Sequence, residues 1–276
     1  MTDRRLTPAN GRVAAAHLRG QVQADRFVEG AAARVAVPVA TLRRAPDGAR
    51  DRELLLGAAV TTYEDRDGWA FVQAAADGYV GYLHASELSA SQPLPTHRVT
   101  ARATHAYALP DLKSEDRMAL PMGAQLRVRA QNDRFADTDL GHIPASHLSP
   151  LDTPAADPVA VAERLIGTPY LWGGNSCWGI DCSGLVQIAF HLCNRACPGD
   201  SDLQEAALGE TLPAGTPPLR GDLMFWKGHV AWVSGPDTLL HANAHHMSVT
   251  FEPLADAIAR IAAQGDGPVT RHARLT

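Results

Sequence analysis

The stretch GTPYLWGGNSCWGIDCSGLVQIAF, at residues 167–190, is the most informative segment for the fold of the C-terminal part of the chain. Turn-forming glycines lead to Asp181-Cys182-Ser183, and apolar residues at helical spacing follow. We expect Cys182 in the first turn of a helix, where unpaired N–H groups and the positive end of the dipole favour the thiolate and lower the pKa of the thiol. Because the thiolate is the nucleophilic form, Cys182 is the predicted nucleophile.

Two short strand-like runs beyond this helix carry histidines. His229 opens the run HVAWVS and His241 ends the run TLLHA, with the hairpin-like SGPDT between them. Adjacent antiparallel strands bring residues near their outer ends together. We predict that His229 is the base for Cys182 and that His241 holds the His229 imidazole in the right tautomer. With helices first and an antiparallel sheet after, this region is predicted to be α+β.

Upstream of this region the sequence pattern is typical of small β-barrels. Short apolar or alternating runs are separated by turn signals, among them Asp-Gly pairs at 47–48, 67–68 and 77–78. The segments 79–88 and 139–148 share the pattern G-x-[LI]-x-A-S-x-L, which is an internal repeat. Two related all-β barrels are therefore predicted.

Pro-containing linkers at 91–97 and 149–158 suggest the domain boundaries. The predicted fold class is multidomain, with two small all-β barrels followed by an α+β domain. The predicted segments are an N-terminal arm at 1–30, a first barrel at 31–90, a second barrel at 96–150 and the α+β domain at 155–276.

Composition argues against nucleic-acid and membrane partners. The 276 residues carry a formal net charge of −5, with both signs mixed along the chain. Arg4 and Arg5 are not followed by the apolar segment of a secretory signal, and no run reaches the roughly 20 apolar residues of a membrane span. We expect a soluble, cytoplasmic protein; its oligomeric state does not follow from the sequence.

All four cysteines fall between 177 and 197, which indicates local chemistry rather than a disulfide framework. Apart from Cys182, they are interpreted as small apolar core residues. An alternative is a zinc site, with the ligands Cys177, His191, Cys193 and Cys197. His245 and His246 are interpreted as solvated loop residues. A metal site of His229, His241 and His245 is left open, although we predict no metal and no cofactor.

Several motifs in a fixed order resemble the NlpC-type cell-wall peptidases, a family of papain-like cysteine peptidases. They are P-Y-x-W-G-G, D-C-S-G-L-V-Q, G-D-L-x-F-W, H-V and H-A. The resemblance covers about 160–276, and the spacing of 12 between the two histidines (241 − 229) fits it. It implies a papain-like domain with Cys182, His229 and His241 as its active-site residues.

The two barrels resemble the bacterial SH3-like domains that precede this domain in one subgroup of the family. That subgroup cuts γ-D-glutamyl-L-diamino acid bonds of murein stem peptides and requires a free N-terminal L-alanine. The resemblance implies that a set of residues binds the substrate: Asp181, Ser183, Ser201, Tyr79, Glu53 and Trp172. Tyr82 competes with Tyr79 for the role of closing the cleft.

Two further features bear on this substrate site. The family usually has P-R-D before the serine, whereas this chain has Pro198-Gly199-Asp200-Ser201 and lacks the arginine. An ion pair that supports the site is therefore expected to be missing. Asp181 also suits the N-cap position of the helix, a role that is compatible with substrate binding.

The predicted function is hydrolysis of the γ-D-glutamyl-L-diamino acid bond of a small cell-wall peptide, in murein recycling. One alternative is a non-catalytic protein that binds wall fragments. Another is an acyltransferase or amidase that uses the same Cys-His pair, since related folds support such chemistry. The sequence does not say whether the diamino acid is meso-diaminopimelate or lysine.

Overall fold

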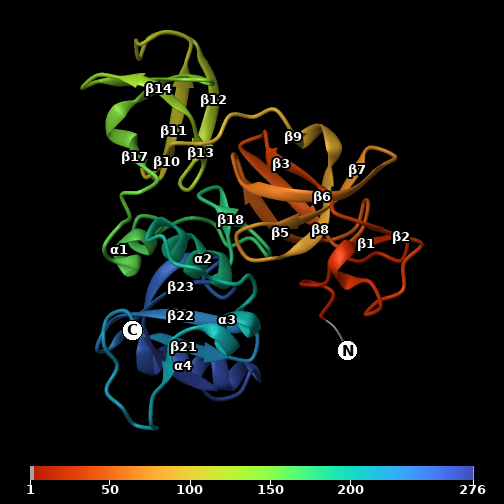
Figure 1. The fold of residues 1–276 in the computed structure, drawn as a ribbon. Coiled ribbons are helices and arrows are strands. Elements are labelled where there is room, and N and C mark those ends of the chain that lie inside the picture. The colour runs from red at the N-terminus through yellow and green to blue at the C-terminus, as the bar shows by residue number, and fades with distance from the viewer. Residues whose placement is uncertain (1–2, 276) are drawn as a thin grey trace. The chain divides into compact units, whose positions relative to one another are not determined.

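The computed structural model describes residues 3–275, which divide between Leu151 and Asp152 into two compact units (Figure 1). Each unit has its own hydrophobic clusters. None of the helices within residues 3–275 is long and apolar enough to cross a membrane.

The first barrel is a seven-stranded antiparallel sheet in the order β5-β4-β8-β7-β6-β3-β9. Its strands are β3 (Ala31–Val35), β4 (Val39–Arg43), β5 (Arg50–Leu55), β6 (Ala59–Arg66), β7 (Trp69–Ala74), β8 (Val80–His84) and β9 (Leu88–Ser89). The Asp67-Gly68 pair joins β6 to β7 as predicted, and both residues have positive φ, 53° and 81°. Positive φ at both turn residues matches the right-handed twist of the two strands.

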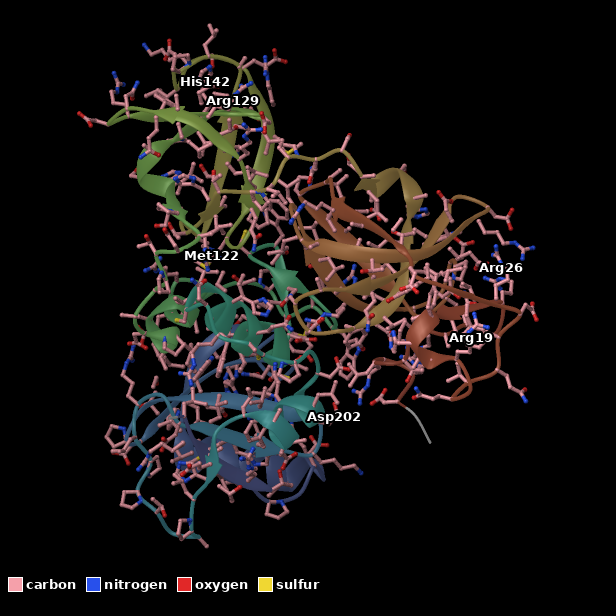
Figure 2. The ribbon with its side chains drawn as sticks, in the orientation of Figure 1. Arg19, Arg26, Met122, Arg129, His142 and Asp202 are labelled. Atoms are coloured by element: carbon pink, nitrogen blue, oxygen red, sulfur yellow. The ribbon has the colours of Figure 1, made fainter. Side chains whose placement is uncertain are left out.

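The N-terminal segment packs on this barrel. Its short strands β1 (Val13–Ala15) and β2 (Arg26–Val28) pair in parallel, and Val13 joins a buried aromatic cluster of β7 and β8. The Arg12 guanidinium lies 2.6 Å from Glu64 Oε2, and Arg26, which is labelled in Figure 2, lies 3.6 Å from the other oxygen. The Arg12 hydrogen bonds, opposed by burial, lower the pKa of Glu64. The segment is thus held by an apolar contact and by charge.

The second barrel consists of two small sheets in the orders β13-β10-β17 and β12-β11-β16-β15-β14. Its strands are β10 (His97–Val99), β11 (Ala103–Tyr107), β12 (Asp116–Pro121), β13 (Gln125–Leu126), β14 (Val128–Gln131), β15 (Phe135–Thr138), β16 (Gly141–Pro144) and β17 (Leu148–Pro150). The sequence repeat has the same local structure in both barrels. A strand, a one-turn 3-10 helix and a second strand follow one another at Val80–Ser89 and again at Gly141–Pro150.

Leu56 and Gly57 connect the two barrels. Leu56 is buried in the second barrel's core, and its carbonyl accepts a 2.8 Å hydrogen bond from the Gln125 amide. Gly57 has a φ of 80°, and a Cβ added there would lie 2.3 Å from the Gln125 carbonyl oxygen. Only glycine fits both the backbone conformation and this close approach.

We predict that Gly57→Ala destabilises the first unit by about 3 kcal/mol, because it adds a steric clash to the cost of positive φ. Gly68→Ala is the matched control, since Gly68 has a φ of 81° and nothing within 4 Å of its added Cβ. That change should cost only about 1 kcal/mol. Urea unfolding followed by circular dichroism measures both, and equal losses would contradict the role of the Gln125 contact.

The second unit has the predicted order of helices followed by an antiparallel sheet. Its helices are α1 (Pro158–Glu163), α2 (Cys182–Leu192), α3 (Ser201–Ala207) and α4 (Leu254–Gln264), and β18 (Asn175–Ser176) and β19 (Gly179–Ile180) form a small hairpin before α2. The sheet has the order β20-β25-β21-β22-β23-β24. Its strands are β20 (Glu210–Thr211), β21 (Leu223–Trp226), β22 (His229–Gly235), β23 (Thr238–Asn243), β24 (Ser248–Pro253) and β25 (Arg271–Arg274).

Helices α2 and α4 cover opposite faces of this sheet. On one face, the Phe190 ring of α2 stacks on Trp232 of β22 with centroids 5.6 Å apart. On the other face, Ala231 and Val233 of the same strand pack in a cluster with Ile261 of α4. Successive residues of a strand point to opposite faces of the sheet, so β22 is buried on both sides.

Candidate active site

The Asp181 carboxylate organises the start of helix α2. Its Oδ1 accepts hydrogen bonds from the Gly184 amide at 2.7 Å and from the Ser183 hydroxyl at 2.9 Å. Its Oδ2 accepts the Gly173 amide at 2.8 Å. Asp181 is therefore the N-cap of α2, as the sequence suggested, and it also ties the preceding glycine turn to the helix.

Cys182 follows this cap as the first residue of α2 and is buried. Burial raises the pKa of its thiol to about 12, and the Asp181 charge adds to the increase. Backbone N–H groups of Val230, Ser183 and Cys182 itself act in the opposite direction. The expectation of a lowered pKa was wrong for the unliganded protein, because desolvation outweighs the N–H groups at the helix start.

His229 and His241 form the predicted pair. His229 Nε2 lies 2.9 Å from His241 Nδ1, and the ring centroids are 5.1 Å apart. Burial lowers the pKa of His229 to about 3, helped by the neighbouring His241. Val230, the residue after His229, hydrogen-bonds the Cys182 sulfur, so the end of β22 meets the start of α2. A neutral thiol and a neutral imidazole are thus the resting forms.

The hydrogen-bonded chain continues to a glutamate that the sequence analysis did not find. His241 Nε2 lies 2.9 Å from Glu252 Oε2, and His241 is fully buried. Burial raises the pKa of Glu252, but hydrogen bonds from Arg260 and the neighbouring charges outweigh burial and lower it to about 2. Glu252 lies in strand β24, where it pairs with Leu239 of β23, two residues from His241. The polar–apolar alternation of Ser248–Pro253 would have put Glu252 on the exposed face, so the sequence carried no signal for its burial.

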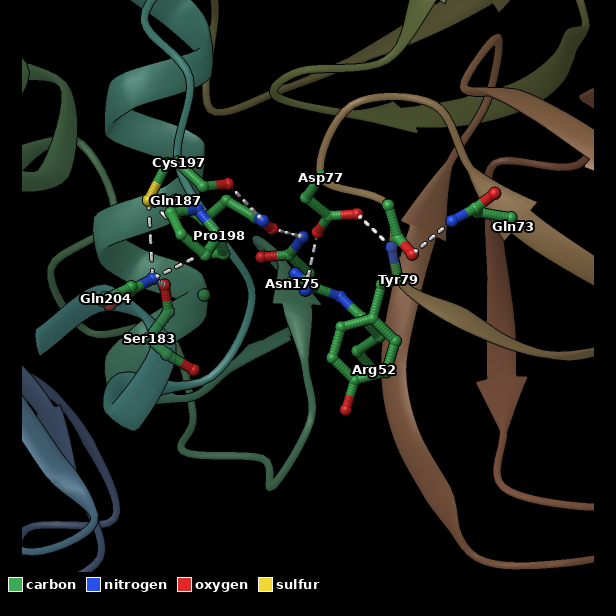
Figure 3. Close-up of polar contacts among 12 residues, drawn as sticks. Arg52, Gln73, Asp77, Tyr79, Asn175, Ser183, Gln187, Cys197, Pro198 and Gln204 are labelled. Atoms are coloured by element: carbon green, nitrogen blue, oxygen red, sulfur yellow. Dashed lines mark hydrogen bonds and ion pairs between the residues drawn. The ribbon is translucent and has the colours of Figure 1, made fainter. Parts of the chain in front are cut away.

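A network of buried amides joins helices α2 and α3 (Figure 3). Gln204 Nε2 donates to the Ser183 carbonyl at 2.9 Å and to the Pro198 carbonyl at 3.1 Å. Gln187 Nε2 donates to the Cys197 carbonyl at 3.0 Å. These bonds hold the loop before α3 against the start of α2. Both glutamines were missed as supports of the site.

Ser201, predicted to bind substrate, is the first residue of α3 and follows that loop. Asp200 lies between Gly199, the position of the family's arginine, and Ser201. Its φ is 34°, a left-handed conformation that is uncommon for residues other than glycine. Ser183 is buried beside Asp181. The structure therefore gathers Asp181, Ser183 and Cys182 at one helix start and fixes the Ser201 loop to it through Gln204.

Trp172 precedes the glycine that bonds Asp181 and is 72% exposed. Nearby Tyr170 has its pKa raised, mainly by burial. His245 and His246 are exposed in the turn between β23 and β24, as predicted.

Tyr79 and Glu53 belong to the first unit. Tyr79 is buried, and the Arg52 guanidinium lies 5.0 Å from the centre of its ring. The Tyr79 amide donates to Asp77, which also pairs with Arg52 at 2.9 Å (Figure 3). Glu53 is buried on β5. Tyr82, the competing tyrosine, instead accepts a hydrogen bond from Asn10 of the N-terminal segment.

Known protein families match segments in both units of the chain. The NlpC/P60 family matches residues 167–261, and the SH3 domain of bacterial dipeptidyl-peptidases matches residues 42–88. The chain contains an NlpC/P60 domain. The predicted family of cysteine peptidases is thereby confirmed, and so is an SH3-like domain ahead of the NlpC/P60 domain.

Individual relatives agree with this assignment. The gamma-D-glutamyl-L-lysine dipeptidyl-peptidase of Bacillus cereus is 26% identical over 249 residues, which cover 74% of this chain and 70% of that protein. Dipeptidyl-peptidase 6 of Lysinibacillus sphaericus is 38% identical over 89 residues, only 31% of either chain. A crystal structure of an NlpC/P60 family protein from Bacillus cereus aligns with a TM-score of 0.73 over 89% of this chain and 99% of that chain, at 21% identity. This last match confirms the predicted fold class.

We predict that acid destabilises the second unit through the buried His229. Its pKa is about 3 in the folded protein and ordinary in the unfolded chain, so the unfolded chain binds the extra proton below pH 6.5. Between pH 7 and pH 5 this one group should remove about 2 kcal/mol of stability. His229→Asn should reduce the pH dependence by that amount.

Urea unfolding followed by tryptophan fluorescence measures this effect, because four of the five tryptophans lie in the second unit. The exposed His245, changed to Asn, is the control and should leave the pH dependence as in the original protein. An unchanged dependence in His229→Asn would show that this imidazole is not kept neutral by the fold.

Proposed function

We propose that this protein is a cysteine peptidase that hydrolyses the γ-D-glutamyl-L-diamino acid bond of bacterial cell-wall peptides. The observation that carries the proposal is the His229–His241 hydrogen bond, with β22 meeting the helix start that holds Cys182. A wall-fragment binder has no need of a buried neutral imidazole at a thiol. The names of the Bacillus relatives support the bond that is cleaved.

Because the Cys182 thiol and the His229 imidazole are both neutral at rest, His229 can act as a general base toward the thiol. As the substrate's γ-carbonyl reaches Cys182, His229 takes the thiol proton and the sulfur attacks the carbonyl carbon. In this scheme the Cys182 backbone N–H, with a neighbouring donor, stabilises the oxyanion. The C–N bond then breaks, and His229 gives its proton to the leaving amine. Water attacks the thioester next, with His229 again as base, and releases the D-glutamyl carboxylate and the thiol.

Asp181 is the proposed partner of the substrate's free N-terminal ammonium. Its carboxylate accepts hydrogen bonds from Gly184, Ser183 and Gly173, and its negative charge lies next to Cys182, where it would attract the ammonium group of a bound peptide. Ser201, Trp172, Tyr79 and Glu53 stay predicted contributors to substrate binding. A role in murein recycling and a cytoplasmic location stay predictions from the sequence.

The test is incubation with L-Ala-γ-D-Glu-meso-diaminopimelate and with its lysine counterpart, each free or N-acetylated, with products read by mass spectrometry. We expect L-Ala-D-Glu and the free diamino acid from the unblocked peptides only. Cys182→Ala should lower kcat/KM by at least about 10⁴-fold, because the covalent route is lost. An added amine acceptor that captures the acyl group would indicate a transferase instead. Intact peptides in every reaction would overturn the proposal.

The proposed role of Asp181 as partner of the substrate ammonium can be tested separately. Asp181→Asn keeps an oxygen to cap α2 but removes the negative charge, so the protein should fold while KM for the free peptide rises about 10-fold or more. Cleavage of the N-acetylated peptide should not fall further. Asp157→Asn, which makes the same change at the N-cap of helix α1, is the control for the loss of a capping carboxylate. Equal effects of the two changes would contradict a direct charge interaction.

A further inference from the structure

We propose that Glu252 is a positioning residue that sets the proton arrangement of both histidines, so that the bare Nδ1 of His229 is the base. The inference rests on the proposed function, which gives His229 that role. Glu252 touches neither substrate nor thiol in this scheme and acts through His241.

The geometry around Glu252 leaves its carboxylate one orientation. Arg260 donates from Nε to Oε1 at 2.8 Å and from Nη2 to Oε2 at 2.7 Å, a two-point clamp. Arg260 is itself steadied by Nη1, which donates to Gln264 one turn along α4 at 2.9 Å. Oε2 therefore faces His241 Nε2 at 2.9 Å from a buried, fixed position.

The protons then follow from donor and acceptor rules. An ionised carboxylate only accepts hydrogen bonds, so His241 Nε2 must carry a proton. A neutral His241 consequently has a bare Nδ1, which accepts a hydrogen bond from His229 Nε2. With its proton on Nε2, neutral His229 has a bare Nδ1. The opposite tautomer of His241 would set a lone pair against the carboxylate at 2.9 Å.

The same carboxylate supports the charged step of the reaction. When His229 accepts the thiol proton it becomes an imidazolium, which remains hydrogen-bonded to His241. Polarisation along a buried chain of hydrogen bonds carries the effect of the Glu252 charge toward that imidazolium. The chain runs from Arg260 at the helix α4 surface to the thiol site, entirely within the second unit.

Two substitutions separate proton placement from charge. In Glu252→Gln the carbonyl oxygen should take the Oε2 position, which faces two donors, and the amide nitrogen the Oε1 position, which faces Arg260 Nε, so that His241 keeps its tautomer. We expect kcat to fall roughly 10-fold, from loss of charge. Glu252→Leu removes the acceptor and should lower kcat about 100-fold or more, with KM little changed. Glu163→Leu, which breaks a 2.7 Å pair with Arg220 in the same unit, is the matched control.

The deciding readout is the nitrogen-15 spectrum of histidine-labelled protein, because it needs no peptide. The original protein and Glu252→Gln should show protonated Nε2 and bare Nδ1 on both His229 and His241, whereas Glu252→Leu should show altered or mixed tautomers. A proton on His229 Nδ1 in the original protein would overturn the inference even if no variant folds. Unchanged spectra and kcat in Glu252→Leu would also overturn it. The expected spectra without peptide cleavage would leave the tautomer assignment standing and reject the proposed function.

Discussion

The Asp181 carboxylate holds together the part of the molecule on which the site depends. It accepts two backbone amides and one hydroxyl, so the glycine turn before it and the helix after it share one anchor. Cys182 comes next in the chain, so its position at the helix start follows from this cap. Buried amides of Gln187 and Gln204 then fix the neighbouring loop to the same helix start. These hydrogen bonds fix the backbone on both sides of Cys182.

Burial of this site has an electrostatic consequence. It raises the pKa of the Cys182 thiol and lowers the pKa of His229, which favours the neutral forms of both groups over the ion pair. The proton therefore moves as the bond to substrate forms. The ionised Glu252 is hydrogen-bonded to the histidine pair through His241, and its charge is balanced by Arg260. A buried charge that is paired and hydrogen-bonded is tolerated, whereas an unpaired one is not.

The first unit is held together mainly by apolar packing. Its barrels are closed by short strands and tight turns, and the N-terminal segment adds an apolar side chain, Val13, to an aromatic cluster. Small barrels have little core, so such additions weigh more than they would in a larger domain. Leu56 inserts into the second barrel while Gly57 allows the backbones to meet, so the two barrels share a core contact within one compact unit.

Local pattern was enough to predict much of this protein. Helical spacing after Cys182, alternation around His229 and His241, Asp-Gly turns and the repeated strand motif all depend on neighbours in sequence. The ionisation of Cys182 and the role of Glu252 depend instead on what surrounds each group in space. Burial reversed the expected pKa of the thiol, and the Glu252 contact joins residues 241 and 252 across paired strands to a helix. The sequence determined the elements and pointed to Cys182, His229 and His241 as candidates, while the tertiary structure decided their protonation, because desolvation and hydrogen-bond partners exist only after packing.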